Sequence, residues 1–556
     1  MPGKSILNYN DDATGMRYAP LDAIEPYTRR WVDLVLDHVE VDQFVLSVAL
    51  PDIGFHRSNI CELYGSRQLK HSEYFDPHRT SPHQLHGAKV FARLIEDGTD
   101  VIEVMAKRVH DRGVKFIAEV RVNDTHFSVI DPTSHKCSQF LLDHPDWTIK
   151  RTDLPPNLRE TALDYSYPEV RAHRLAIIEE LANRPEVDGV ELNCNRWLKF
   201  FPREIAPEKA LILTDFMGQV HAVLAKAARA RGRDHLLFGA RVSSTIEECR
   251  LAGIDIPEWL RRGYFDYLIV ADWNWSNLQL PIEEFVELAK STNCKIIVQI
   301  SDGFGGVWNG KPSMKDRNRG VAIMPDKDGY SALRNTEAEA RAIAANIYAW
   351  GGDGVGVWNV CDHMGLPDHE TPKNPGIGAA FRQRMVSWMQ QVGDPQTVMS
   401  GPRHYHYCPL WKWPRAQTLH PHREQYHSPA GGKHCQIVTF ADSSLGKRQT
   451  YKFRMADGRN GEPLTGQVKF QIFHVDPNDE IVIDVNGIPV APAKLRRDHR
   501  PNADPPATWF EFSLDNGPPL RGDNELGITL KPASRKSETP YLEELEVYVI
   551  APSSHR

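Results

Sequence analysis

A β-strand predicted near the middle of the chain carries polar side chains along one of its faces. The stretch reads DGVELNCNRW, residues 188–197. Successive side chains of a strand point to opposite faces, so Glu191, Asn193 and Asn195 share one face and the apolar residues between them share the other. Burying polar groups without partners is costly. We therefore expect the polar face to line a site.

Other predicted strands end in side chains of the same kinds. The segment AEVRVNDTH places Glu119, Arg121 and Asn123 on one face and continues to Asp124 and His126. The other polar and aromatic residues at predicted strand ends are Asn8, Asn10, Arg241, Asp272, Gln299, Asp302 and Trp358. In a barrel of parallel strands, the carboxyl ends meet at one mouth, so these side chains would gather there.

Carboxylates, amides, arginines and tryptophans together suit a carbohydrate site. Carboxylates and amides bind sugar hydroxyl groups, and the faces of indole rings stack on sugar rings. Two carboxyl groups on either side of a glycosidic bond can act as acid and nucleophile, or as acid and base. The strand ends therefore predict a site for a poly- or oligosaccharide.

The elements that must position these residues follow an alternating pattern. Short apolar strands alternate with longer amphipathic stretches that are typical of helices. The predicted strands are residues 5–10, 44–50, 115–122, 189–194, 236–242, 267–272, 295–301 and 354–360. This alternation indicates right-handed βαβ units around a parallel sheet. Eight strands predict a closed (β/α)8 TIM barrel of the α/β class over residues 1–400.

The pattern changes after the barrel. Residues 401–435 are rich in proline, histidine and tryptophan and are predicted to form a connector. From 436 to 556 the segments are all strand-like and are separated by turn signals, which predicts an all-β sandwich of the jelly-roll kind. We expect this sandwich to brace the barrel, because it shows no aromatic stripe that would bind a glycan.

Composition excludes several classes of partner. The net charge of −7 is spread along the chain, so no basic face for nucleic acid is predicted. No apolar stretch approaches the ~18 residues of a membrane span. The eight cysteines show no paired spacing, which favours a reducing compartment. We expect a cytoplasmic protein, or a secreted or periplasmic one if a signal peptide has been removed.

Neither a metal nor a cofactor is predicted. The histidines and cysteines of the connector, beginning with HYHYC at residues 404–408, match no standard zinc spacing. The chain contains no G-x-S-x-G and no HExxH motif. SDGFGG, residues 301–306, lacks the lysine and the spacing of a phosphate loop and indicates a flexible loop.

Structural roles are open for several of the candidate residues. Glu119 could form a buried ion pair with Arg121 or Arg241. Asp124 and Asp302 could be turn or helix-cap residues. The tryptophans at strand ends could pack in the core as readily as they could bind a sugar.

Residues 164–202 resemble the glycosyl-hydrolase-10-like proteins, a family of barrel glycosidases. The nearest members, from environmental bacteria, carry an RVND-H block and an ELDF-R block. The first block stands here as residues 121–124 followed by His126, whereas the second keeps Glu191 and has Asn193 in place of the usual aspartate. The resemblance covers most of residues 5–390 and implies a bacterial TIM-barrel glycoside hydrolase.

The resemblance also implies roles for the residues at the mouth. Many barrel glycosidases place one catalytic carboxyl group after strand four and another after strand six or seven. This implies that Glu191 is the general acid/base and that Asp272, or else Asp302, is the nucleophile or the base for water. The residues expected to bind substrate are Arg121, Asn123, Asp124, His126, Asn193, Asn195, Arg241, Asp302 and Trp358. The two arginines make an acidic or sulfated sugar a candidate.

Two other functions are compatible with these residues. If Asn193 replaces the essential acid, the barrel binds a glycan without hydrolysing it. Alternatively, Glu191 or His126 could act as a base, with Arg121 as the stabiliser of an enolate, in a lyase or isomerase acting on a sugar acid. A fold of this kind hosts many chemistries, so all three functions remain open at this point.

Overall fold

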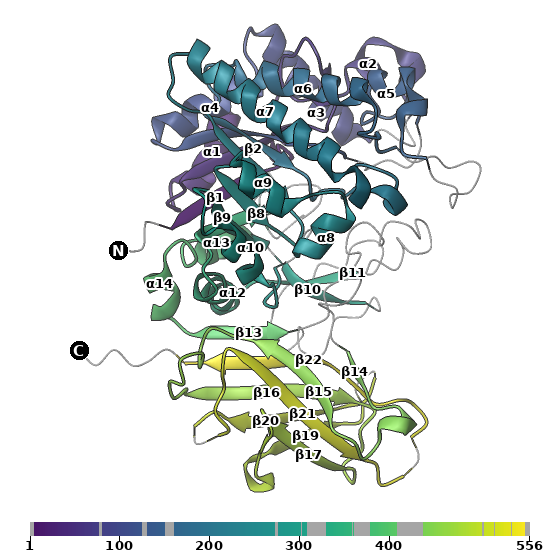
Figure 1. Cartoon of the computed structure of the whole chain (residues 1–556), viewed down its shortest axis with the longest axis vertical. Helices are drawn as coiled ribbons and strands as arrows, with labels where there is room; N and C mark the ends of the chain where they lie inside the picture. Colours follow the sequence, from purple (N-terminus) through teal and green to yellow (C-terminus); the bar gives the residue numbers. More distant parts are fainter. Residues whose placement is uncertain are drawn as a thin grey trace.

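The computed structural model describes residues 5–76, 81–124, 130–150, 161–272, 276–301, 303–308, 330–358, 360, 378–407, 437–502, 505–515, 517–534 and 536–550. A barrel with its helices forms the larger part, and antiparallel sheets near the C-terminus form the smaller part below it in Figure 1. The predicted combination of an α/β barrel with all-β sheets is confirmed.

Eight parallel strands close the barrel. They are β1 (Ile6–Asp11), β2 (Gln43–Ala49), β5 (Lys115–Arg121), β6 (Gly189–Asn193), β7 (Leu237–Val242), β8 (Tyr267–Val270), β9 (Lys295–Ser301) and β12 (Gly354–Trp358). Strand β1 pairs with both β12 and β2, which completes the ring. Two short strands, β3 (Ile53–Gly54) and β4 (Glu62–Leu63), extend the sheet beyond β2.

Amphipathic helices surround the barrel. They are α1 (Ile24–Leu36), α2 (Ser66–Lys70), α3 (Pro82–Glu96), α4 (Val101–Asp111), α5 (Gln139–Asp143), α6 (Pro168–Ala182), α7 (Ala210–Ala230), α8 (Ile246–Leu251), α9 (Ile256–Arg262), α10 (Ile282–Ala289), α12 (Glu337–Ala349), α13 (Gly378–Met389) and α14 (Pro395–Ser400). Several begin at a side chain that caps the free amide groups of the first turn; Thr336 and Glu339, for example, form a capping box at α12. None of the described helices has the length and hydropathy needed to span a bilayer.

Two antiparallel sheets form the C-terminal part. One contains β13 (Arg403–Tyr407), β22 (Tyr541–Val549), β16 (Gly466–Phe473), β20 (Ala507–Ser513) and β19 (Arg496–Arg500), with β14 (Val438–Thr439) beside β22. The other contains β15 (Gln449–Arg454), β21 (Asp523–Lys531), β17 (Glu480–Val485) and β18 (Ile488–Pro489). A separate hairpin joins β10 (Gly303–Trp308) to β11 (Tyr330–Arg334). Residues 403–407 lie in the predicted connector but form β13, and residues 408–435 lie outside the described residues.

The sandwich packs directly against helices of the barrel. Arg454 of β15 forms an ion pair of 2.7 Å with Glu283 of α10. Asn346 of α12 donates a hydrogen bond of 3.0 Å to the Arg454 carbonyl. Gln279 donates another, of 2.8 Å, to the Lys452 carbonyl. These contacts are those of a brace, because they tie strand β15 to the side of the barrel.

The part of the barrel interior that lies farther from the mouth is apolar and tightly packed. Tyr267, Ile269 and Ile297 form a small buried cluster there. Gly239 lies beside Tyr267, and a Cβ atom at this position would come within 2.1 Å of the tyrosine ring. A glycine is needed here so that the Tyr267 ring can cross the interior and direct its hydroxyl group toward Glu191.

We expect Gly239→Ala to destabilise the protein, because overpacking of a filled interior typically costs about 1–3 kcal/mol. The matched control is Gly393→Ala, where the added methyl group would meet Leu7 at an ordinary 3.5 Å. Thermal unfolding followed by circular dichroism measures both variants. Equal melting temperatures for the two variants would contradict this account of the interior.

Candidate active site

Alternate strands contribute a layer of polar side chains on the mouth side of the apolar cluster. Asn10 of β1 donates a hydrogen bond of 2.7 Å to Oε2 of Glu119 on β5. Arg241 of β7 donates one of 2.7 Å to Oε1 of Gln299 on β9. Side chains from alternate strands fill the interior of a TIM barrel in such layers. The polar strand faces predicted from the sequence therefore point into the barrel.

Glu191 lies deep in the interior of the barrel, and both of its carboxylate oxygens accept hydrogen bonds. Arg241 reaches Oε1 at 3.3 Å, whereas Tyr267 and Asn8 reach Oε2 at 3.1 and 3.5 Å. Its side chain is fully buried. Burial raises the pKa of the Glu191 carboxyl, and the Arg241 guanidinium opposes the rise. The carboxylate expected to be catalytic is thus held in a buried ion pair.

Glu119 is also fully buried, but its two oxygens differ. Oε2 accepts hydrogen bonds from Asn10 and from Asn193, the latter at 3.2 Å. Oε1 accepts none from the residues that the structure describes, and it faces Nε of Arg121 at 3.6 Å. Burial raises the pKa of Glu119 to about 7; Arg121 opposes this rise and the charge of Glu191 adds to it. A carboxyl group with this pKa is partly protonated at neutral pH, so it can donate a proton.

Arg121 lies between three carboxylates. Besides Glu119, it forms ion pairs with Asp12 and, at 3.2 Å, with Asp124. Burial opposes the charge of Arg121, but Asp12 and Asp124 together raise the pKa of its guanidinium. The predicted ion pairing of Glu119 with an arginine is present as the 3.6 Å contact with Arg121.

Trp358 stacks beside the two arginines of the interior. The guanidinium carbon of Arg241 lies 4.4 Å from the centroid of the indole ring, and that of Arg121 lies 5.9 Å from it. The ring is almost fully buried. Trp358 therefore makes cation–π contacts with the same two arginines that neutralise Glu191 and Asp124.

The three asparagines predicted to bind hydroxyl groups are all engaged within the protein. Asn193 Oδ1 accepts hydrogen bonds from the backbone amides of Asn195 and Arg196, at 3.2 and 2.8 Å. The side-chain amide of Asn195 donates to the Ala271 carbonyl at 2.8 Å. That of Asn123 donates to the carbonyl of Leu163 at 2.9 Å. These contacts fix the backbone at the mouth, and hydroxyl binding by the three amides stays a prediction.

Asp272 follows β8 and is nearly buried. Its Oδ2 accepts a hydrogen bond of 2.8 Å from Asn277. Two other predicted site residues, His126 and Asp302, lie outside the described residues. The structure brings together Glu119, Glu191, Asn193, Arg121, Arg241 and Trp358 through the contacts given above. The place of Asp272 in this site stays a prediction.

Three residues of this network were not predicted as site residues. Glu119 shares a strand face with Arg121, a signal that fits a structural ion pair as well as a site residue. Asp12 directly follows a strand with two asparagines, but its position gave no reason to choose it as a site residue. Tyr267 stands at the start of its strand, where sequence alone indicates the amino end of the barrel. Only the space beside Gly239 lets its ring reach Glu191.

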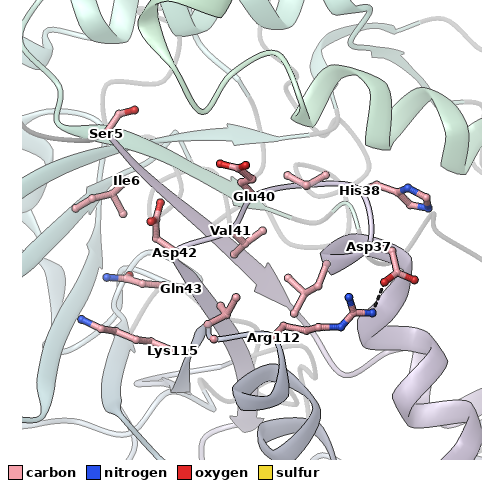
Figure 2. A pocket seen from close by; sticks show the side chains of 14 residues that line it. Ser5, Ile6, Asp37, His38, Glu40, Val41, Asp42, Gln43, Arg112 and Lys115 are labelled. Atoms are coloured by element: carbon pink, nitrogen blue, oxygen red, sulfur yellow. Dashed lines mark hydrogen bonds and ion pairs between the residues drawn. The ribbon is translucent and has the colours of Figure 1, made fainter.

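A hollow of about 720 Å³ lies at the opposite end of the barrel (Figure 2). It is lined by the first residues of β1, β2 and β5, among them Ser5, Gln43 and Lys115. Polar groups at this end are engaged in structural contacts: Asp37 pairs with Arg112, and Asp42 accepts a hydrogen bond from the amide of Leu7. Residues at the amino end of a TIM barrel typically serve stability.

The five cysteines that the structure describes are free and buried: Cys61, Cys137, Cys194, Cys249 and Cys294. Burial raises the pKa of the Cys194 thiol. The thiol form therefore dominates at neutral pH, and this group is a poor nucleophile. Cys194, beside the polar face of β6, thus acts as a small apolar residue.

No family model matches the sequence, and no curated protein sequence matches it. The glycosyl-hydrolase-10-like assignment therefore stays a prediction. Among solved structures, the endo-β-1,4-mannanase from Thermotoga petrophila matches with a TM-score of 0.42 at 10% identity, over 99% of this chain and 98% of that one. The PgaB (BpsB) glycoside hydrolase domain from Bordetella bronchiseptica matches with a TM-score of 0.39 at 12% identity, over 64% of this chain and 94% of that one.

The chitinase TsES1 from Trichuris suis matches with a TM-score of 0.39 at 10% identity, over 70% of this chain and all of that one. Likenesses this distant carry no argument about function. The function proposed below therefore rests on the side chains of the barrel.

Arg241→Met is expected to destabilise the protein strongly, by about 3–5 kcal/mol, because it leaves Glu191 buried without its cation. The matched control is Arg250→Met, which removes an exposed pair with Glu247 on α8 and should leave stability unchanged. Urea unfolding gives the free energy of unfolding of each variant. A small effect of Arg241→Met would show that the ion pair does not stabilise the interior.

The raised pKa of Glu119 predicts a pH dependence of stability. A carboxyl group whose pKa rises from 4.5 to about 7 on folding favours the folded state at low pH, and this contribution is lost as the pH rises through about 7. We expect the melting temperature of the wild type to fall more steeply between pH 5 and 8 than that of Glu119→Gln, which cannot ionise. Parallel curves for the two proteins would contradict the raised pKa.

Proposed function

We propose that the protein is a glycoside hydrolase whose active site is the mouth of the barrel. One observation carries the proposal. Glu119 is a buried carboxyl group with a pKa of about 7, and one of its oxygens accepts no hydrogen bond from the described residues. A glycosidase needs a carboxyl group that is still protonated near neutrality, so that it can protonate the leaving oxygen.

In this mechanism Glu119 is the proton donor and Asp272 is the second carboxyl group. Oε2 of Glu119 is held by Asn10 and Asn193, so we assign the proton to be transferred to Oε1, which faces Nε of Arg121 at 3.6 Å. Asp272, after β8, would act as the nucleophile or as the base for water. The replacement of the usual aspartate by Asn193 then has a role. An asparagine can donate a hydrogen bond to Glu119, whereas an ionised aspartate would repel its carboxylate.

Glu191 is assigned a positioning role in this proposal, in place of the acid/base role that the resemblance implies. Both of its oxygens accept hydrogen bonds from within the barrel. Its negative charge raises the pKa of Glu119, and its ion pair fixes Arg241 beside the Trp358 ring. Glu191 therefore supports the acid and the position of Arg241 without touching the substrate.

The charges around the mouth are mixed. Arg121 and Arg241 are both paired with carboxylates. Five carboxyl groups (Asp12, Glu119, Asp124, Glu191 and Asp272) accompany these two arginines at the strand ends. Lys136 lies within electrostatic reach of Asp124 and of a further cation, Arg196. We therefore propose a poly- or oligosaccharide that is either neutral or carries an acidic or sulfate group.

Glycan binding without hydrolysis is the second candidate. It is favoured by Asn193, which stands on the inward face of β6 where the resemblance implies an aspartate. A barrel of this kind would bind the same sugars. The experiment that tests hydrolysis also separates the two functions.

The test is product release from a panel of neutral, acidic and sulfated aryl glycosides and polysaccharides. We expect Glu119→Gln and Asp272→Asn each to lower kcat/KM about 10²–10⁴-fold, as expected when a catalytic acid or base is removed. Wild-type activity should fall as the pH rises above about 7, because Glu119 then loses its proton. The control is Glu247→Gln, on the exposed surface of α8, which should retain full activity.

Other outcomes reassign the roles. Full activity in Glu119→Gln, with loss in a folded Glu191→Gln, would return the acid role to Glu191. Saturable binding of a glycan, with no product after prolonged incubation, would identify a binding protein. Product with absorbance from a new double bond would identify a lyase.

A further inference from the structure

A second cluster of titratable side chains lies away from the barrel mouth, between the barrel and the sandwich. It contains Glu339 of α12, His404 and His406 of β13, and Glu544 and Glu546 of β22. Strand β13 lies along the edge of the sandwich that faces the barrel, below α12 and α14 in Figure 1. His404 and His406 are two residues apart on a strand, so both point toward α12.

The two imidazoles share one carboxylate oxygen. Nδ1 of His406 lies 3.0 Å from Oε1 of Glu339, and Nδ1 of His404 lies 3.5 Å from the same oxygen. The two rings are nearly parallel, at 11°, with centroids 5.4 Å apart. Ligand atoms of all three residues lie within 4.8 Å of one another.

The opposite nitrogen of each ring is bound by a carboxylate of β22. Nε2 of His406 lies 2.5 Å from Oε1 of Glu544, and Nε2 of His404 lies 2.6 Å from Oε2 of Glu546. An ionised carboxylate can only accept hydrogen bonds, so Nε2 of each ring carries the proton. In a neutral imidazole Nδ1 is then an acceptor, and it faces another acceptor, the Glu339 oxygen.

A cation between the three atoms removes this conflict. Metal-binding histidines typically donate their other ring N–H to a carboxylate, which is the arrangement of Glu544 and Glu546 here. Ligands about 2.0–2.2 Å from a tetrahedral ion lie about 3.3–3.5 Å from one another, close to the 3.0 and 3.5 Å observed. A divalent ion would also offset the charge of three carboxylates in a buried place.

Hydrogen bonds orient Glu339 toward the two histidines. Its Oε2 accepts hydrogen bonds from the amide and hydroxyl groups of Thr336, at 2.9 and 2.8 Å, which directs Oε1 toward the histidines. Glu544 is likewise fixed by Gln471 of β16 at 3.1 Å. The side chains of Glu339 and His406 are almost fully buried.

We propose that Glu339, His404 and His406 bind a divalent transition-metal ion of the Zn²⁺ class, which fastens the sandwich to helix α12 of the barrel. Two imidazole nitrogens and one carboxylate oxygen form a donor set that suits Zn²⁺. This differs from the expectation drawn from the sequence, where HYHYC was assigned to a connector and no metal was predicted. The spacing matches no zinc motif because the third ligand comes from another domain.

The test uses the full chain, produced without a polyhistidine tag and stripped with a chelator. Co²⁺ replaces Zn²⁺ as the probe, because a tetrahedral Co²⁺ site absorbs visible light. We expect the wild type to bind one equivalent of Co²⁺ and to melt at a higher temperature with the metal than without it. His404→Gln and His406→Gln should lose both effects. The control is His235→Gln, which removes an exposed histidine paired with Asp266 and should bind as the wild type does.

Two results would overturn the proposal. One is a folded wild type that gives no visible absorption and no melting shift with Co²⁺, which would indicate that protons on Nδ1 join the histidines to Glu339. The other is unchanged binding by His404→Gln and His406→Gln. If a variant fails to fold, X-ray absorption of the Zn²⁺-loaded wild type tests the site instead. A spectrum that shows two imidazole ligands would support the site, and a spectrum that shows no imidazole ligand would refute it.

Discussion

The ion pair between Glu191 and Arg241 organises the interior of the barrel. A charged carboxylate in this position is tolerated only with a cation and further donors, and Arg241, Tyr267 and Asn8 supply them from three other strands. The same guanidinium donates to Gln299 and stacks on Trp358. One buried pair therefore fixes side chains from β1, β6, β7, β8, β9 and β12. The polar mouth is built on this layer and on Glu119 beside it.

The barrel could be predicted from the sequence because its signals are local. Each strand is a short apolar run, and each is followed by a helical pattern, so strand order and sheet direction follow from connection rules. The depth of a side chain within the barrel is not local. Glu191 precedes Asn193 in its strand and therefore lies deeper, but only the registers of the neighbouring strands show which residues lie beside each of them.

The same limit explains why Glu191, and not Glu119, was predicted to be catalytic. Both are inward glutamates on adjacent strands, paired in register. What separates them is the number of donors around each carboxylate, and these donors come from strands distant in sequence. Tyr267 contributes one of them only because Gly239 leaves room for its ring. Roles that depend on such packing follow from coordinates and not from residue type.

Strand β13 was also beyond prediction from composition. Its five residues stand before a segment rich in proline and tryptophan, and its partner β22 lies more than a hundred residues later in the chain. The alternation of Tyr405 and Tyr407 with His404 and His406 is a strand pattern, with the tyrosines turned into the sandwich. Tyr405 donates a hydrogen bond to Asp457, and Tyr407 donates one to the Arg454 carbonyl.

The sandwich and the mouth are connected through helix α12. This helix contacts the sandwich through Glu339 and Asn346, and the chain then enters β12, which ends at Trp358. A shift of α12 would move β12 and, with it, the indole ring that rests on Arg241. Fixing α12 against β13 and β15 therefore holds one wall of the mouth in place. The sandwich can act on the site in this way without touching a substrate.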